Sequence, residues 1–283
     1  MKALLAALWV SAACAQDLTV LLGRLSEEAE VYRRMAPQAI AEETLEQRAS
    51  IPSRRTGKVR LQTREIVSEY SVGALKEAPE RLHEFRQVLS VDGRRLAKPE
   101  KARRTLSLGL ASPDDRLRKR MLEEFQAHGL AGAAVDFGPL ILLFTKRQIG
   151  NYRFSLSGAA RVGADEAVVL DYRQAAGDQN LTVFAGRNTI RQPLAGQVLL
   201  RKADGLPLRI TMRAARTENG HTFVEEGVVD YVMTAHGFVA PATVLHRSIA
   251  DGQLAAEDRF RYATFRRFSA DAEIKFNEVP EVK

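Results

Sequence analysis

The feature that most constrains the fold is an alternation of apolar and polar residues across positions 151–268, interrupted at even intervals by turn signals. Tyr152, Phe154 and Leu156, for example, alternate with polar residues. This period of two places apolar side chains on one face of a strand and polar side chains on the other. Asp or Asn followed by Gly favours two-residue hairpins, because both positions tolerate positive φ. Such pairs are Asp204-Gly205, Asn219-Gly220 and Asp251-Gly252.

The second half of the chain is therefore predicted to be an antiparallel meander. An earlier hairpin is predicted from strands near 58–72 and 82–91, which ends at the Asp92-Gly93 turn. On the last strand, alternation places Phe260, Tyr262 and Phe268 on one face and Phe265 on the other. The strands of the meander are predicted near 151–159, 166–174, 196–202, 206–216, 221–234, 238–249 and 254–268.

The segment before the sheet is predicted to be helical from Asp17 to about Ala49. Its first part repeats apolar residues at spacings of three and four, and Pro37 should interrupt it. A second helical part is expected at 37–47, which is rich in Ala and Glu. Residues 51–57 then form a linker. The repeated apolar residues of the first part are Leu18, Leu21, Leu22, Leu25, Ala29 and Tyr32.

A further helix is predicted near 113–128. Ser112 can cap it, Pro113 suits its first turn, and Gly129 can end it. The run 137–144 is the most apolar stretch after the N-terminus. Periodicity does not distinguish a short buried helix from a core strand over so few residues, so both remain open.

The N-terminus has the pattern of a cleavable secretory signal over residues 1–15. Lys2 supplies the positive charge, 3–10 the apolar stretch, and Ala13-Cys14-Ala15 the cleavage site before Gln16. The apolar stretch is much shorter than the roughly 20 residues of a membrane span. Lipidation at Cys14 is the less favoured alternative, because Ser11 stands where bacterial lipoprotein signals usually carry Leu. The mature protein is expected in the periplasm or outside the cell, divided into a helical segment and linker at 16–57 and a sheet at 58–283.

Cleavage after Ala15 would remove the only cysteine, so the mature chain would have neither a disulfide nor a thiol nucleophile. The formal net charge is +7, with basic clusters that include 101–104 and 116–120. Solvated faces explain these clusters better than a polyanion site, because acidic residues lie among them. Export argues against nucleic acid as a partner, while weak association with an anionic membrane surface stays open.

The sequence carries no recognisable catalytic or nucleotide-binding motif, and we expect no enzyme activity, no cofactor and no metal. Its five histidines are dispersed. His221 and His246 could meet across neighbouring strands, but two imidazoles alone make a poor metal site. Glu225 and Glu226 should point to opposite faces of a strand and so should not share a site.

The stretch 196–210, Gly-Gln-Val-Leu-Leu-Arg-Lys-Ala-Asp-Gly-Leu-Pro-Leu-Arg-Ile, resembles the periplasmic lipoprotein-carrier superfamily of LolA-, LolB- and RseB-like half-barrels. In that superfamily a strand that ends at an Asp-Gly turn is followed by one that begins Leu-Pro-Leu. Residues 259–276 look like its closing strand and tail. The resemblance implies an α+β fold in which a curved antiparallel β-sheet, a half-barrel, encloses helices or is lidded by them.

The resemblance also implies a carrier that holds an apolar ligand or a lipidated protein in its concave face. A filled core is the structural alternative. An envelope sensor or protein-interaction module, and a hydrolase with a dispersed site, are the functional alternatives. The residues expected to line the ligand site are Leu140, Leu142, Phe144, Phe154, Leu156, Leu208, Ile210 and Met212.

Overall fold

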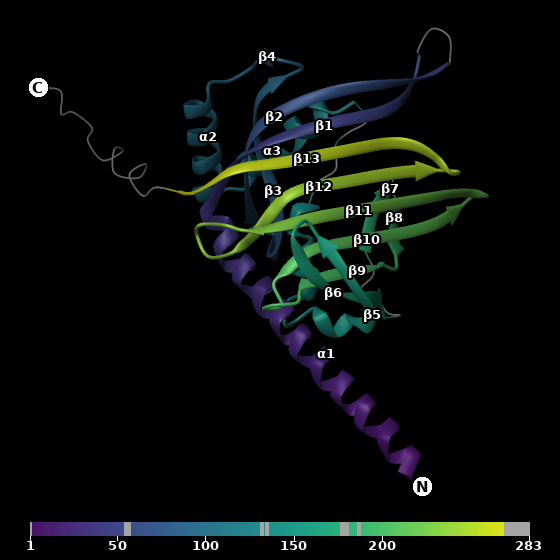
Figure 1. The fold of residues 1–283 in the computed structure, drawn as a ribbon. Coiled ribbons are helices and arrows are strands. Elements are labelled where there is room, and N and C mark those ends of the chain that lie inside the picture. Colours follow the sequence, from purple (N-terminus) through teal and green to yellow (C-terminus); the bar gives the residue numbers. More distant parts are fainter. Residues whose placement is uncertain are drawn as a thin grey trace, which may run out of the picture.

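The computed structural model describes residues 2–53, 58–130, 133, 136–175, 181–185 and 188–268, without the side chains of 2–17 and 181–192. It confirms the predicted α+β class: a long curved antiparallel sheet with helices packed on it (Figure 1). The sheet has eleven strands in the described part of the chain, in the order β4-β3-β2-β1-β13-β12-β11-β10-β9-β6-β5. It is open at β4 and β5, as in a half-barrel.

The predicted meander is confirmed, and each predicted strand overlaps an observed one. Two short strands that the sequence did not reveal, β7 and β8, form a separate hairpin between β6 and β9. The strands are β1 (Ala39–Pro52), β2 (Val59–Leu75), β3 (Ala78–Val91), β4 (Arg94–Arg95), β5 (Tyr152–Val162), β6 (Asp165–Gln174), β7 (Leu181–Ala185), β8 (Asn188–Gln192), β9 (Ala195–Arg201), β10 (Pro207–Glu218), β11 (His221–Met233), β12 (Val239–Ala250) and β13 (Gln253–Arg267).

The helix predicted at 37–47 is wrong, because these residues belong mostly to β1. This strand lies in the interior of the sheet, paired antiparallel with β2 on one side and β13 on the other. Its buried positions alternate, but Glu43 and Gln47 occupy two of them, on either side of Leu45. Buried polar residues on the inner face hide the period of two from an analysis of hydropathy.

The helical elements agree better with the sequence. The predicted helix near 113–128 exists, although it begins only at Arg116, and the apolar run at 137–144 forms a 3₁₀-helix. A helix at 99–111 was not predicted. The first helix passes without a break through Ala15, so signal cleavage stays a prediction. The helices are α1 (Lys2–Met35), α2 (Pro99–Ala111) and α3 (Arg116–His128), and the 3₁₀-helices are η1 (Ala36–Gln38), η2 (Gly138–Phe144) and η3 (Ile149–Asn151).

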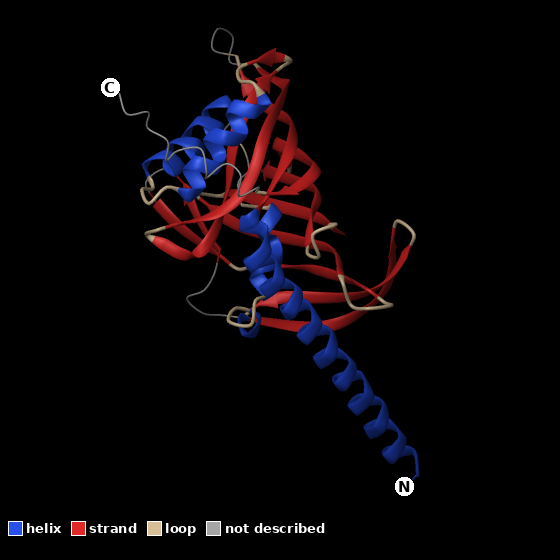
Figure 2. Ribbon diagram, turned by 90° about the vertical axis from the view of Figure 1, so that its left-hand side faces the viewer, coloured by secondary structure: helices blue, strands red, loops and turns tan. Residues whose placement is uncertain are grey.

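The helices pack on both faces of the sheet. The inner face is defined here as the one that contacts α1 and η2, and Leu25, Ile141 and Phe144 from these elements are fully buried against it. Neighbouring strand residues point to opposite faces, and Ile40 and Ala41 belong to different apolar clusters. The helix α2 therefore covers the outer face of β1–β3, whereas α1 runs along the inner face (Figure 2).

The prediction for Phe265 on the last strand is wrong. Thr264 has a positive φ of 55°, and the pairing with β1 shifts between Ala263 and Arg266. Such a bulge adds a residue and reverses the alternation beyond it. The ring of Phe265 consequently stacks on Tyr262, with centroids 6.5 Å apart, and packs against the inner core.

Candidate functional site

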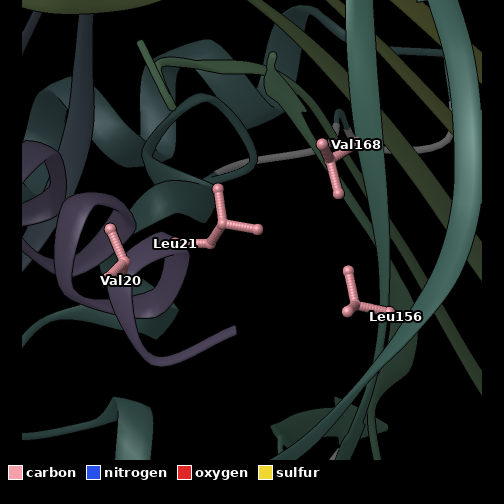
Figure 3. A pocket seen from close by; sticks show the side chains of 4 residues that line it. All are labelled: Val20, Leu21, Leu156 and Val168. Atoms are coloured by element: carbon pink, nitrogen blue, oxygen red, sulfur yellow. The ribbon is translucent and has the colours of Figure 1, made fainter. Parts of the chain in front are cut away.

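An apolar cleft of about 350 Å³ lies between α1 and the strands at one end of the sheet. Figure 3 shows Val20 and Leu21 on the helix and Leu156 and Val168 on the strands opposite, with their side chains around the opening. All four side chains are aliphatic. The cleft can therefore hold an apolar group by burial, and its side chains offer no hydrogen bond to a polar one.

Local sequence explains why these side chains meet. Leu21 belongs to the inward stripe of α1, while Val20 lies one position off it and is 67% exposed. Leu156 pairs with Leu170, beside Val168, on the inner face of β5 and β6. A bulge between Leu156 and Gly158, where φ is +143°, interrupts the register immediately afterwards. Leu156 remains 41% exposed at the open end of the sheet.

Of the predicted ligand-site residues, only Leu156 lines this cleft. Leu140, Phe144, Ile210 and Met212 are buried together in the main core, and the predicted ligand role of all eight residues stays untested. Leu142 and Phe154 pack against that core with partial exposure. The centre of the inner face is thus a packed core, because side chains of α1 and η2 occupy the space in which the ligand was expected.

Leu208 lies on the other face of the sheet, contrary to the prediction. The pairing of β10 with β9 shifts between Pro207 and Arg209, which inserts one extra residue. Leu208 therefore leaves the alternation that Ile210 and Met212 follow. It packs in a small outer cluster with Ala167, Val169 and Leu199.

An aromatic cluster joins η2 to β5 and β6, the two strands that also line the cleft. The ring of Phe144 lies 5.5 Å from Tyr152, 5.6 Å from Phe154 and 5.0 Å from Tyr172, centroid to centroid, in edge-to-face contacts. The Tyr172 hydroxyl donates a hydrogen bond to the carbonyl of Thr211 at 2.8 Å. Burial raises the pKa of Tyr152 to about 12, so its hydroxyl stays protonated at neutral pH.

A charged network lies in the core at the other end of the inner face. The buried guanidinium of Arg86 donates to both carboxylate oxygens of Glu43, at 2.7 and 2.8 Å, and to Glu84 at 3.1 Å. Glu84 also accepts hydrogen bonds from the Tyr70 hydroxyl and the Gly138 amide, each at 3.1 Å. The network thereby ties η2 to β1–β3.

The electrostatics of this network indicate a structural role. Burial raises the pKa of Glu43, and Arg86 opposes that shift. Burial lowers the pKa of Arg86, but Glu43 and Glu84 outweigh it and the guanidinium stays charged. Arg86 also lies 4.4 Å from the ring centroid of Phe125, a cation–π contact. These side chains are nearly inaccessible, so a substrate could not reach the carboxylates without displacing α1 or η2.

A second buried charged group is His246, which lies between two carboxylates. Its Nε2 is 2.8 Å from Glu225 Oε2, and its Nδ1 is 3.5 Å from Asp258 Oδ2. Burial lowers the pKa of His246, but the contacts with Asp258 and Glu225 outweigh it and raise the pKa to about 9. The ring of Phe137 covers the imidazole at 4.5 Å. His246 is therefore charged at neutral pH and acts as an internal cation.

His221 and His246, which the sequence allowed to meet across neighbouring strands, do not meet, because His246 lies opposite Gly227. His221 is exposed at the start of β11, and its Nδ1 lies 2.7 Å from Asp251 Oδ2. Glu225 contacts His246, while Glu226 contacts Arg213 at 3.3 Å on the other face, so the predicted divergence of the two glutamates is confirmed. Within the described ranges, no three His, Cys, Asp or Glu side chains cluster in a way that could hold a metal ion.

Comparisons with known proteins add little to this geometry. No protein-family model and no curated protein matches the sequence significantly. The chain is similar to a domain described as an outer membrane lipoprotein-sorting protein from Vibrio parahaemolyticus, with 11% identity, a TM-score of 0.36, and coverage of 87% of this chain and 92% of that one. A DUF1329 family protein from Desulfovibrio piger ATCC 29098 has 11% identity, a TM-score of 0.38, and coverage of 89% and 93%.

Identities and TM-scores this low support no conclusion about function. Among the described helices, none is both long and apolar enough to cross a membrane.

Proposed function

We propose that this protein is an exported carrier that binds an apolar chain in the cleft between α1 and the β5–β6 end of the sheet. The observation that carries the proposal is the pair of exposed aliphatic side chains, Val20 and Leu156, across a cleft whose described lining side chains are all aliphatic. Water-exposed apolar surface arranged around a concavity is typical of a ligand site. An acyl chain, free or attached to a lipidated protein, fits this chemistry.

The size of the cleft favours a slender ligand. Its volume of about 350 Å³ is at the small end of the range usual for ligand pockets. Burial of one methylene contributes about 0.8 kcal/mol, so a chain that buries roughly six methylenes gains about 5 kcal/mol before the cost of ordering.

The proposal is tested with a fluorescent fatty acid and two matched valine variants. Val20→Asn places an amide in the cleft and should weaken binding about fivefold, because part of the burial of one aliphatic side chain is lost. Val59→Asn is the control, since Val59 is 63% exposed, much like Val20, but lies on β2 away from the cleft. Leu156→Asn should reproduce the loss from the opposite wall.

Equal affinities for wild type, Val20→Asn and Val59→Asn would contradict a ligand site at this cleft, as would wild type that takes up no apolar probe. A protein-interaction module is then the leading alternative, because β5 is an edge strand of the sheet and most of its residues are exposed. A partner strand could add to such an edge. Native mass spectrometry of the exported protein distinguishes a bound acyl chain from a bound polypeptide.

A further inference from the structure

The positive charge of the chain is concentrated just before and within α2. Residues 94–104 contain six basic residues and one acidic residue, a net +5 against the formal +7 of the whole chain. They begin at β4, on the edge of the sheet, and continue through a short loop into the helix (Figure 1). The basic residues are Arg94, Arg95, Lys98, Lys101, Arg103 and Arg104.

The outward face of α2 carries both charge and apolar surface. Ala102, Leu106 and Gly109 are buried against the sheet, which fixes the orientation of the helix. Lys101 and Leu108 lie on the opposite side, seven residues or about two turns apart. Leu108 is 47% exposed, and Leu96 in the preceding loop is also 47% exposed.

Most of these cations are available to an external anion. Arg103 lies 3.0 Å from the buried carboxylate of Glu69, which also attracts Arg266 at 3.7 Å. By contrast, no ion pair among the described residues involves Arg94, Arg95, Lys98 or Lys101. These four residues and the exposed Leu96 and Leu108 are called the α2 surface below.

We propose that the α2 surface docks the protein on an anionic membrane. The charge of the α2 surface complements acidic lipid headgroups, and a cluster of four to eight Lys and Arg on an amphipathic element is characteristic of such binding. Leu96 and Leu108 favour a membrane over a soluble polyanion, because aliphatic side chains gain free energy in the headgroup–acyl boundary and gain none beside a polyanion. The cleft lies at the other end of the sheet, so docking leaves it open to solvent.

Vesicle co-sedimentation tests the proposal with the full chain. Wild type should bind vesicles of phosphatidylglycerol and phosphatidylcholine, should bind pure phosphatidylcholine far less, and should lose most of this preference at about 0.5 M salt. The double variant Arg94→Glu/Lys101→Glu should bind at least about twentyfold more weakly, because each charge near the surface contributes about fivefold. Leu108→Ser should weaken vesicle binding severalfold and leave heparin binding unchanged.

The control is Arg153→Glu/Arg161→Glu, which makes the same change in net charge on β5 with two exposed arginines. It should keep most of the vesicle affinity. An equal loss in the control would show that net charge alone drives binding and would overturn the proposal. Heparin binding without vesicle binding, or vesicle binding that Leu108→Ser does not change, would assign the surface to a soluble polyanion instead.

Discussion

The charged state of His246 should make this protein less stable as the pH rises above neutral. Folding raises the pKa of His246 from its ordinary value of 6.5 to about 9. A group whose pKa is raised on folding stabilises the native state fully below the unfolded pKa, and this stabilisation is lost as the pH rises through the folded pKa. The free energy of unfolding should therefore fall between about pH 6.5 and pH 9.5.

The magnitude follows from the size of the shift. One pKa unit corresponds to about 1.4 kcal/mol, so the whole His246 contribution is about 3 kcal/mol. Two carboxylates face the imidazole, Glu225 at 2.8 Å and Asp258 at 3.5 Å, and both lose their cation when His246 deprotonates. Ser248 and Gln47 donate hydrogen bonds to these carboxylates, and neither hydroxyl nor amide titrates in this range.

Urea unfolding at a series of pH values, followed by circular dichroism, measures this effect. His246→Gln should be less stable than wild type at pH 6.5, and its unfolding free energy should be nearly constant up to pH 9.5. His221→Gln is the matched control, because His221 is exposed beside Asp251, and it should follow the wild-type curve. If His246→Gln kept the full wild-type decline, the assignment of the decline to His246 would be refuted.

Two further predictions follow from burial and charge, and a third from the N-terminal signal pattern. Ile210→Asn should cost several kcal/mol in urea unfolding, because Ile210 is fully buried and the amide would lack partners. Arg86→Met should lower the free energy of unfolding by about 3–5 kcal/mol, because Glu43 would be left buried without its cation. Calorimetry should show a smaller loss at lower pH, where protonation neutralises Glu43. Intact-mass analysis of the exported protein should show an N-terminus at Gln16 without lipid, and a diacylated Cys14 would contradict that expectation.

The sequence predicted the meander well because its signals are local. The alternation of apolar and polar residues and the Asp-Gly or Asn-Gly turns can each be recognised within about ten residues. In the structure, Asn219, Asp251 and the glycines that follow them have positive φ, as these turns require. The wrong predictions, such as a helix in place of β1, arise where a residue distant in the sequence determines the local structure. Glu43 is acceptable inside a strand only because Arg86, 43 residues later, neutralises it.

The candidate site was less predictable than the fold. A bulge beside Pro207 moved Leu208 to the outer face. Proline is typical of bulges and strand starts, but the alternation of hydropathy alone does not register it. Leu156 was identified by its alternation, whereas Val20 lies outside the apolar stripe of α1 and had no reason to be chosen. A cleft between elements more than 130 residues apart depends on how α1 crosses the sheet, which hydropathy does not specify.

The pairing of β1 with β13 has a consequence for how the chain acquires its structure. Gln47 and Asp258, opposite each other in this pair, are 211 residues apart. Closing so long a loop is slow, and until it closes β1 and β13 each present an unpaired edge in the middle of the future sheet. The strand β13 thus joins the two halves of the sheet, and without it the edges of β1 and β12 would be exposed in addition to those of β4 and β5.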